Sequence, residues 1–379
     1  PVYYPNRVGP VGGIVGLMTA WYLAQDGVEV TLLDARDFGT QASGANAGSI
    51  HLQIQYPEFV AYGEGWARLY APSLRLLKQS LALWQDLSAL VDEDLDVKLA
   101  GGLVVATTEP QMERIRAKAR IEATEGVETA ILGRAELRAL APYLGADAIG
   151  AGFCAMEGKA NPLRATPAIA AAAARAGAAL LRNVAVTGIE AVPGGFLART
   201  PAGPSRAARV ANAAGEEDAR LPARLGVAVA LQGFPLQVTV TEPVAPLIPH
   251  LVYSAAGKLS LKQAANGGCI IGGGWPARER PGGGLATDPR SLAGNMAMAA
   301  GVVPAMAGAR ALRSWTAWVN GTADWRPIIG EAPGVPGFFL AIFPWVGFSA
   351  GPMTARVTAD LVQGRPPRLP LGGISVLAD

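Results

Sequence analysis

Gly12-Gly13-Ile14-Val15-Gly16, an apolar run to Gln25, and then Val28-Glu29-Val30-Thr31-Leu32-Leu33-Asp34 decide the fold of this chain. The spacing predicts a glycine turn, a helix that Gly27 ends, and a strand, as in a βαβ unit that binds a dinucleotide. Glycines let backbone N–H groups approach a pyrophosphate at the helix N-terminus, where the helix dipole favours anions. Asp34, about 20 residues after the glycines, is placed to accept hydrogen bonds from ribose hydroxyls.

The residues before the turn depart from this pattern. Val11 stands where the G-x-G-x-x-G fingerprint has its first glycine, and Pro10 would remove a hydrogen-bond donor from the preceding strand. The first ten residues therefore either follow an unusual path or carry a sequence that does not form this strand. A glycine turn without a cofactor is the alternative interpretation, and the helix, the strand and Asp34 together argue against it.

Composition limits the class of protein. A chain of 379 residues, half of them apolar and 16% charged, predicts a globular enzyme of two domains. The net charge of +2, without a basic run, argues against nucleic-acid binding. Residues 165–181 and 294–312 are the most apolar stretches, but both contain arginine and proline, so we expect no transmembrane segment and no signal peptide.

The two cysteines, Cys154 and Cys269, lie far apart and lack metal-ligand spacing. We therefore expect no metal site and no disulfide, and a reducing, cytoplasmic location follows as the simpler expectation. A peripheral position at the inner membrane is the alternative.

A second segment identifies a family. Residues 36–50 contain Ala42-Ser43-Gly44-Ala45-Asn46-Ala47-Gly48-Ser49-Ile50, and here the chain resembles the D-amino-acid oxidase superfamily of FAD-dependent oxidoreductases. That superfamily includes glycine and sarcosine oxidases, D-amino-acid dehydrogenases, and the flavin subunits of heteromeric proline, hydroxyproline and opine dehydrogenases. In these proteins the segment wraps the pyrophosphate and the edge of the flavin.

Three later segments follow in the family's order. Residues 184–189 are similar to the strand whose Val186 contacts adenine, and residues 209–215 are similar to a strand and turn that return to the cofactor. Residues 324–330 precede a last glycine loop at residues 347–353, followed by a helical run to Gly364. The resemblance implies that this loop lies over the flavin pyrimidine, where N–H groups stabilise negative charge.

The resemblance thus implies an FAD site that draws on most of the chain. Ala317 stands near the position at which monomeric sarcosine oxidases attach flavin to a cysteine, so we expect non-covalent FAD. The expected cofactor-binding residues are Gly12, Gly13, Ile14, Val15, Gly16, Asp34, Ala35, Arg36, Ala42, Ser43, Asn46, Ala47, Gly48, Ser49, Val186, Ala213, Ala214, Gly215, Gly347, Phe348, Ser349, Ala350, Gly351, Pro352 and Met353.

The expected fold is α/β (α+β), with a discontinuous Rossmann-like FAD-binding domain and an antiparallel-sheet substrate domain. Helical spacing at residues 73–95 and 109–142 and alternation at residues 233–242 and 251–275 predict helices and strands for the substrate domain. We assign residues 1–72, 143–220 and 316–379 to the FAD-binding domain, and residues 73–142 and 221–315 to the substrate domain.

Two positions depart from the oxidase members of the family. Val319 stands where glycine oxidase-like members carry the arginine that binds the substrate carboxylate, so another cation or another mode of recognition is expected. The oxygen-activating lysine of sarcosine oxidases falls near Gly272. The absence of a lysine there favours a dehydrogenase over an oxidase.

Three residues are candidates for catalysis. His51 follows the flavin-edge segment and could orient substrate or accept a proton, although a structural role fits equally well. Lys262 lies on an expected strand, where a solvated lysine is the plainer interpretation. Arg326 could bind a carboxylate, although a surface or flavin-loop residue is the plainer interpretation. Trp318 and Trp345 are expected to wall the pocket or to lie in the core.

The sequence therefore predicts FAD-dependent oxidation of a C–N bond in an amino acid or amine, with a dehydrogenase preferred. A glycine- or sarcosine-type oxidase that uses oxygen is one alternative, and a non-catalytic flavin electron-relay subunit is another. The heteromeric members of the family imply a second flavin subunit or an iron–sulfur subunit as partner.

Overall fold

The computed structural model describes residues 13–215 and 219–378, so the expectations for the first ten residues, Val11 and Gly12 lie outside it. The helices are α1 (Ile14–Gln25), α2 (Ala42–Ala45), α3 (Tyr56–Tyr70), α4 (Ser73–Val91), α5 (Glu109–Thr124), α6 (Arg134–Leu140), α7 (Pro162–Arg175), α8 (Arg220–Arg224), α9 (Pro289–Val302) and α10 (Gly347–Val362). The strands are β1 (Thr31–Leu33), β2 (Ser49–Ile50), β3 (Gly102–Ala106), β4 (Ala130–Gly133), β5 (Gly150–Cys154), β6 (Gly158–Lys159), β7 (Ala179–Leu181), β8 (Gly188–Val192), β9 (Gly195–Arg199), β10 (Ser205–Ala207), β11 (Val210–Asn212), β12 (Gln232–Pro243), β13 (Leu251–Ser254), β14 (Ser260–Gln263), β15 (Gly268–Pro276), β16 (Arg278–Glu279), β17 (Leu285–Ala286), β18 (Ala311–Gly321), β19 (Ile328–Glu331) and β20 (Phe338–Ile342).

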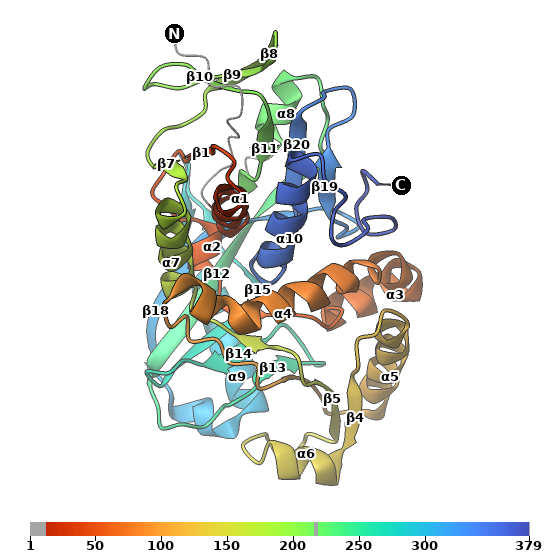
Figure 1. Ribbon diagram of the computed structural model, residues 1–379. Coiled ribbons are helices and arrows are strands. Elements are labelled where there is room, and N and C mark those ends of the chain that lie inside the picture. Colours follow the sequence, from red (N-terminus) through yellow and green to blue (C-terminus); the bar gives the residue numbers. More distant parts are fainter. Residues whose placement is uncertain (1–12, 216–218, 379) are drawn as a thin grey trace.

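The predicted glycine turn, helix and strand are present. Gly13 is the N-cap of α1 in an extended conformation, and Gly27, at φ +76°, turns the chain towards β1. β1 pairs in parallel with β7. Helix α1 is buried on nearly all sides because it packs against both α7 and α10 (Figure 1). An apolar surface all round a helix is what such a central position requires.

The segment at residues 184–189, expected to contact adenine, differs from the predicted secondary structure. Residues 184–187 are irregular, and the strand expected at residues 184–189 begins only at Gly188, in a separate antiparallel sheet of β8, β9 and β10. The reason is local hydrogen bonding: the Val184 N–H donates to the Asp34 carbonyl at 2.7 Å, so the chain crosses the end of β1. The strand expected at residues 209–212 is confirmed as β11, which pairs in parallel with β20.

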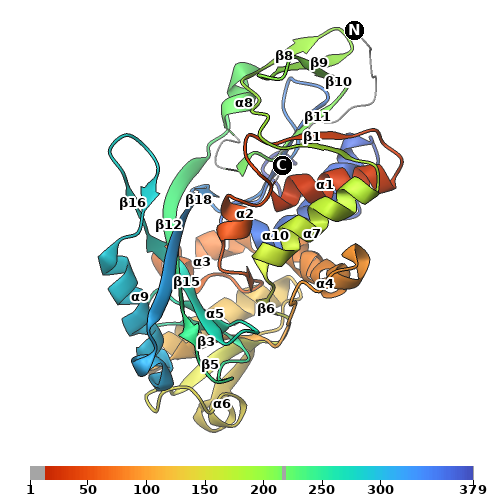
Figure 2. The same ribbon diagram turned by 90° about the vertical axis from the view of Figure 1, so that its left-hand side faces the viewer.

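The largest sheet has eight strands in the order β18-β12-β15-β14-β13-β3-β5-β4. Neighbouring strands are antiparallel except for β13 and β3, which are parallel, so the sheet is mixed. The strands predicted at residues 233–242 and 251–275 are confirmed as β12, β13, β14 and β15. In Figure 2 the long strands β12 and β18 extend from this sheet towards the part that contains α1 and α10.

One helix prediction and one loop prediction need correction. Residues 109–142 form no single helix, because Gly126 at φ +71° follows the end of α5 and β4 pairs with β5 before α6 begins. The glycine loop expected at residues 347–353 is the first part of α10. The helix expected at residues 73–95 is present as α4, which packs against α10.

The eight-stranded sheet also uses strands from both sides of the expected domain boundaries. β5 was assigned to the FAD-binding domain, yet it pairs with β3 and β4 of the substrate domain. α4 belongs to the same buried cluster as α1 and α10, although it was assigned to the substrate domain. The division into domains stays a prediction. No helix among the described residues is long and apolar enough to cross a membrane.

Candidate functional site

A cavity of about 1050 Å³ lies between the α1–α10 part and the large sheet, and segments from the start, middle and end of the chain line it. It begins beside Asp34 at the end of β1 and passes the N-terminal ends of α1 and α10. Strands β12, β14, β15 and β18 also contribute to its lining. Such an elongated, mostly apolar space with a few polar groups is typical of a cofactor and substrate site.

The segment after β1 is held against the N-terminus of α1. The Ile14 N–H donates to Ser43 Oγ at 2.9 Å, and Asn46 accepts from the Gly48 N–H at 2.7 Å while its amide donates to the Ser43 carbonyl. Gly48 has φ +77°, and a Cβ there would lie 2.3 Å from the Ala160 carbonyl, so only glycine fits. The sequence therefore shapes a tight turn beside the α1 amides.

The first turn of α10, near the C-terminus, forms another part of the cavity lining. Ser349, in the first turn of α10, accepts a hydrogen bond from the His51 N–H at 2.8 Å and donates to the Ser49 carbonyl at 3.2 Å. These contacts join residues that lie about 300 positions apart in the chain. They bring the N-terminal amides of α10 to the same cavity as Ser49 and His51.

Most of the expected cofactor-binding residues meet at the cavity. Those that line it are Gly13, Ile14, Val15, Asp34, Ala35, Arg36, Ala42, Ser43, Asn46, Ala47, Ser49, Val186, Ala213, Ala214, Gly215, Gly347, Phe348 and Ser349. Those that are not part of this lining are Gly16, Gly48, Ala350, Gly351, Pro352 and Met353. Gly351 instead allows the close crossing of α10 and α1, since a Cβ there would lie 3.0 Å from the Ile14 side chain.

The three catalytic candidates occupy different places. His51 lines the cavity. Lys262 is 1% exposed and lies just behind the lining, where its ammonium donates to Ser49 Oγ and, at 3.2 Å, to Ser260 Oγ. Arg326 is 8% exposed and is not part of the cavity lining. The structure thus brings His51 and Lys262 to one site and leaves Arg326 outside it.

Burial governs the charge of these groups. Burial, and then the charge of Lys159, lower the pKa of Lys262 to about 7. Burial, and then the charge of Lys262, lower the pKa of His51 to about 3, so the imidazole is neutral at neutral pH. The interpretation of Lys262 as a solvated lysine is therefore wrong, because its side chain is enclosed between β14 and the segment of Ser49.

Aromatic side chains form another wall of the cavity. Trp318 and Trp345 line it as expected, and Trp325 and Phe234 join them. The rings of Trp325 and Trp345 stack with centroids 4.9 Å apart, and both residues have left-handed backbone angles, φ +67° and φ +64°. Bulky residues with left-handed backbone angles are strained, and such backbone strain is concentrated at functional sites.

Several lining residues were missed by the sequence reasoning. Tyr253, Ser260 and Lys258 lie on or beside strands that alternation predicts, but alternation does not say which face of a strand meets a cavity. The kink in α3 at Gly63 and the lining residue Glu58 also gave no signal in the sequence. Their placement depends on which strands and helices are neighbours.

Comparison with known proteins agrees with this geometry. A family model described as "FAD dependent oxidoreductase" (DAO) matches residues 8–361 of the chain. The chain belongs to this DAO family of FAD-dependent oxidoreductases. It is 32% identical over 345 residues to one of the subunits of opine oxidase from Rhizobium meliloti, in a match that covers 87% of this chain and 85% of the relative.

Solved structures of the DAO fold superpose along almost the whole chain. The structure of L-proline dehydrogenase from P. horikoshii has a TM-score of 0.86 and 25% identity, covering 98% of this chain and 96% of that one. Glycine oxidase from Geobacillus kaustophilus has a TM-score of 0.83 and 25% identity, covering 98% of both chains. The protein is therefore an FAD-dependent enzyme of mixed α/β fold.

The residues at the cavity suit FAD. The N-cap Gly13 and the turn at residues 42–48 leave amides and hydroxyls beside a helix N-terminus, the environment that a pyrophosphate requires. Asp34 lies at the end of β1, where a carboxylate can accept from ribose hydroxyls. The α10 N-terminus at Gly347–Ser349 faces the same space and favours an electron-rich ring.

Proposed function

We propose that the protein oxidises the C–N bond of an amino acid or secondary amine beside His51, Ser49 and Ser260, which we name the His51 wall. The observation that carries this proposal is that the His51 wall and the cofactor segments line one cavity. A substrate against this wall would therefore share one cavity with a cofactor held by these segments. Such proximity is the condition for direct hydride transfer.

The bound FAD supplies the hydride acceptor, and the remaining tasks fall to residues of the chain. The substrate amine must be neutral to lose a hydride, and the low pKa of His51 keeps the imidazole neutral beside it. A neutral imidazole can accept an amine N–H without adding positive charge. Trp318, Trp345 and Phe234 line the same cavity and would shield a bound substrate from water.

We propose Lys258 as the ligand of the substrate carboxylate. Val319, at the position of the family arginine, lines the cavity but carries no charge. Lys258 lines the same cavity, and its Nζ is held by the Gly274 carbonyl at 3.1 Å. Burial raises the pKa of Glu58, and the charge of Lys258 is near enough to oppose that rise. Lys258 would thus supply the positive charge that a substrate carboxylate requires.

The similarity to a protein named as part of opine oxidase supports opine-type secondary amines as the first substrates to test. Sarcosine, proline, hydroxyproline and D-amino acids are the other candidates. That relative is named as one subunit of its enzyme, which supports a heteromeric complex with a further redox subunit. We also propose a cytoplasmic location, supported by two cysteines that are free and buried.

The structure changes the argument between dehydrogenase and oxidase. Gly272 pairs with Ser260, and Lys262, two positions further along β14, donates to Ser260 Oγ. A buried lysine therefore lies close to Gly272, where the sequence predicted that none would be found. We keep the dehydrogenase proposal because Ser49 and Ser260 separate Lys262 from the cavity. The oxidase remains the second candidate, and Lys262 is the observation that favours it.

An anaerobic substrate screen tests the proposal. The flavin-loaded protein is mixed with each amine class, and loss of flavin absorbance is expected with at least one of them. Dithionite bleaching is the control that the flavin can be reduced. Bleaching by dithionite but by no amine, with or without the partner subunit, would favour the electron-relay alternative. Peroxide release in air at the turnover rate would decide for the oxidase.

The carboxylate ligand is tested with a matched pair of variants. Lys258→Met is expected to raise KM for carboxylated amines about tenfold, the effect of losing one charge-assisted hydrogen bond. Lys98→Met, at an exposed lysine that pairs with Asp96, is the control and should leave KM unchanged. Equal KM values in the two variants would exclude Lys258 from this role.

A further inference from the structure

The first turn of α10 carries N–H groups that no described residue of the chain accepts from. The first hydrogen bond of this helix runs from the Ala350 N–H to the Val346 carbonyl at 3.1 Å. The N–H groups of Gly347, Phe348 and Ser349 precede it and have no acceptor within the described part of the chain. These three residues line the cavity, and a buried N–H without an acceptor costs free energy. The turn therefore favours a ligand that brings acceptor atoms or negative charge into the cavity.

Pro352 removes one hydrogen bond from the same turn. Proline has no N–H, so the Phe348 carbonyl, four residues earlier, lacks its intrahelical donor. The replacement comes from α4, because Trp84 Nε1 donates to the Phe348 carbonyl at 3.3 Å and to the Ser349 carbonyl at 3.2 Å. The rings of Trp84 and Phe348 also pack together, with centroids 4.8 Å apart. An indole from another helix thus completes the first turn of α10.

Ser80, one turn earlier on α4, bonds to the same part of α10. Its hydroxyl donates to the Ser349 carbonyl at 2.7 Å and accepts from the Met353 N–H at 3.3 Å. Residues 349 and 353 are the pair that a regular helix bonds directly, and a side chain inserted between such groups displaces a helix locally. Ser80 and Trp84 are both 0% exposed, so water cannot take their place. The start of α10 is therefore shaped by α4.

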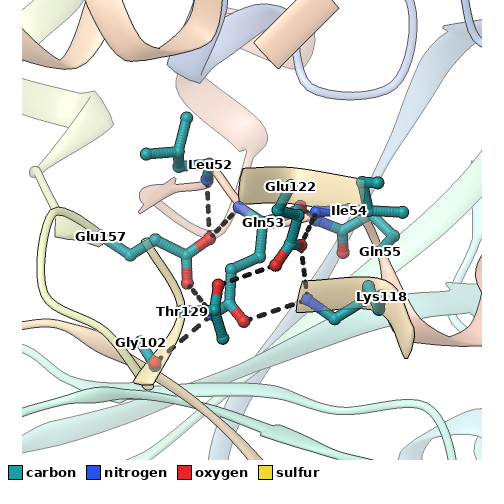
Figure 3. Close-up of polar contacts among 9 residues, drawn as sticks. All are labelled: Leu52, Gln53, Ile54, Gln55, Gly102, Lys118, Glu122, Thr129 and Glu157. Atoms are coloured by element: carbon teal, nitrogen blue, oxygen red, sulfur yellow. Dashed lines mark hydrogen bonds and ion pairs between the residues drawn. The ribbon is translucent and has the colours of Figure 1, made fainter. Parts of the chain in front are cut away.

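The opposite side of this turn is bonded to a segment that buried side chains hold in place. Ser349 Oγ accepts from the His51 N–H at 2.8 Å. The next three residues, 52–54, belong to the buried cluster drawn in Figure 3. Glu157 Oε1 accepts from the N–H groups of residues 52 and 53 at 2.6 and 2.8 Å, and Glu122 Oε1 accepts from that of residue 54 at 2.7 Å. Ser349 is thus bonded both to α4 and to this segment.

We propose that Ser80 and Trp84 are positioning residues that hold the first turn of α10 with its free N–H groups towards the cavity, and thereby favour the reduced flavin. Neither residue lines the cavity, so both act through the carbonyls of Phe348 and Ser349. Free N–H groups at a helix N-terminus stabilise negative charge, and a flavin ring gains electron density on reduction. The inference rests on FAD binding in this cavity, whereas the amine substrate has no part in it.

The test is the midpoint potential of the FAD-loaded, full-length protein, measured by reductive titration beside a reference dye. Ser80→Ala removes the inserted hydroxyl, and Trp84→Phe removes the indole N–H but keeps a ring against Phe348. Each variant should weaken the binding of reduced flavin about tenfold more than that of oxidised flavin. For a two-electron couple this difference makes the potential more negative by about 30 mV.

Ser88 provides a matched control on the same helix. Its hydroxyl accepts from a backbone N–H, that of Leu95, at 3.2 Å. Within the described residues it bonds to no part of α10, and it is absent from the cavity lining. Ser88→Ala should therefore leave the potential unchanged.

A merely structural role for Ser80 and Trp84 predicts a different result. It would lower stability, or weaken oxidised and reduced flavin equally, without a change in potential. An unchanged potential in folded Ser80→Ala and Trp84→Phe, or an equal shift in Ser88→Ala, would overturn the proposal, and loss of folding in both variants would assign them a structural role instead. If no amine reduces the flavin while the potentials shift as expected, the proposed function fails and the positioning role stands.

Discussion

Ser49 Oγ and Ser260 Oγ lie 2.9 Å apart at the cavity wall, although 211 positions separate the two residues in the chain. The ammonium of Lys262 donates to both hydroxyls from behind. The cavity wall thus conceals a buried cation whose hydrogen-bond partners are two neutral hydroxyls. This arrangement has a measurable consequence for stability.

Stability should rise with pH through the titration of Lys262. Its pKa is about 7 in the folded protein and 10.5 for an ordinary lysine, so the unfolded chain binds more protons between these values. The folded state is therefore penalised fully at neutral and lower pH, and the penalty falls by up to about 1.4 kcal/mol per pH unit above that. Lys262→Met, which lacks the charge, should exceed the wild type in stability at about pH 6, with the difference shrinking towards about pH 9.

Urea unfolding at several pH values measures this difference. Lys98→Met, at an exposed lysine, should follow the wild type at every pH. A stability difference between Lys262→Met and the wild type that does not depend on pH would contradict a lowered pKa for Lys262.

The buried pair Lys118–Glu122 should be strongly coupled. Both side chains are 0% exposed and 2.5 Å apart, so Lys118→Met leaves a buried carboxylate without its cation and should cost about 3–5 kcal/mol of unfolding free energy. The double variant Lys118→Met/Glu122→Gln should lose less than the sum of the single variants, because it leaves neither charge alone. Denaturant unfolding of all four proteins gives the coupling energy.

The same helix supplies the control for this cycle. Arg116 and Glu109 on α5 are 2.6 Å apart, but their side chains are 42% and 60% exposed. Their coupling should be below about 1 kcal/mol, since solvent screens the charges. Equal coupling in the two cycles would show that burial does not determine the strength of the Lys118–Glu122 interaction.

Asp34 should contribute to FAD affinity. It lines the cavity at the end of β1, and Asp34→Ala removes an acceptor for ribose hydroxyls, so the Kd for FAD should rise about tenfold or more. Titration of the flavin-free protein, followed by flavin fluorescence, measures the change. Reconstitution with unchanged affinity would exclude this role.

Asp94 provides a matched control for that titration. Asp34 Oδ1 accepts from the Arg36 N–H at 2.7 Å, and Asp94 Oδ1 accepts from the Asp96 N–H at 2.9 Å, so the two make the same local turn. Asp94 is absent from the cavity lining, and Asp94→Ala should not change the Kd. The titration also requires releasable flavin, which we expect because Ala317 lines the cavity and both cysteines lie outside its lining. Flavin that stays with acid-precipitated protein would contradict non-covalent binding.

Much of the cavity lining near α1 was predictable because its determinants are local. The glycine turn before α1, Asp34 at the end of β1 and the turn at residues 42–48 depend on backbone conformation that neighbouring residues impose. The predicted secondary structure was wrong where long-range contacts override local conformational preference. Residues 184–187 leave the regular strand because Val184 bonds across to Asp34, and residues 347–353 become helical as α10 packs against α1 and α4.

The sequence alone determined the FAD-dependent family and most of the segments of the chain that meet at the cavity, since these follow from short motifs in a fixed order. Only the tertiary structure decided the state of the residues at and directly behind the cavity wall. Lys262 becomes a buried, weakly basic group because Ser49 and Ser260 enclose it, and the His51 ring is held at Nδ1 by Tyr253, which comes from another part of the chain. Burial and hydrogen-bond partners set these properties, and both depend on which distant segments become neighbours.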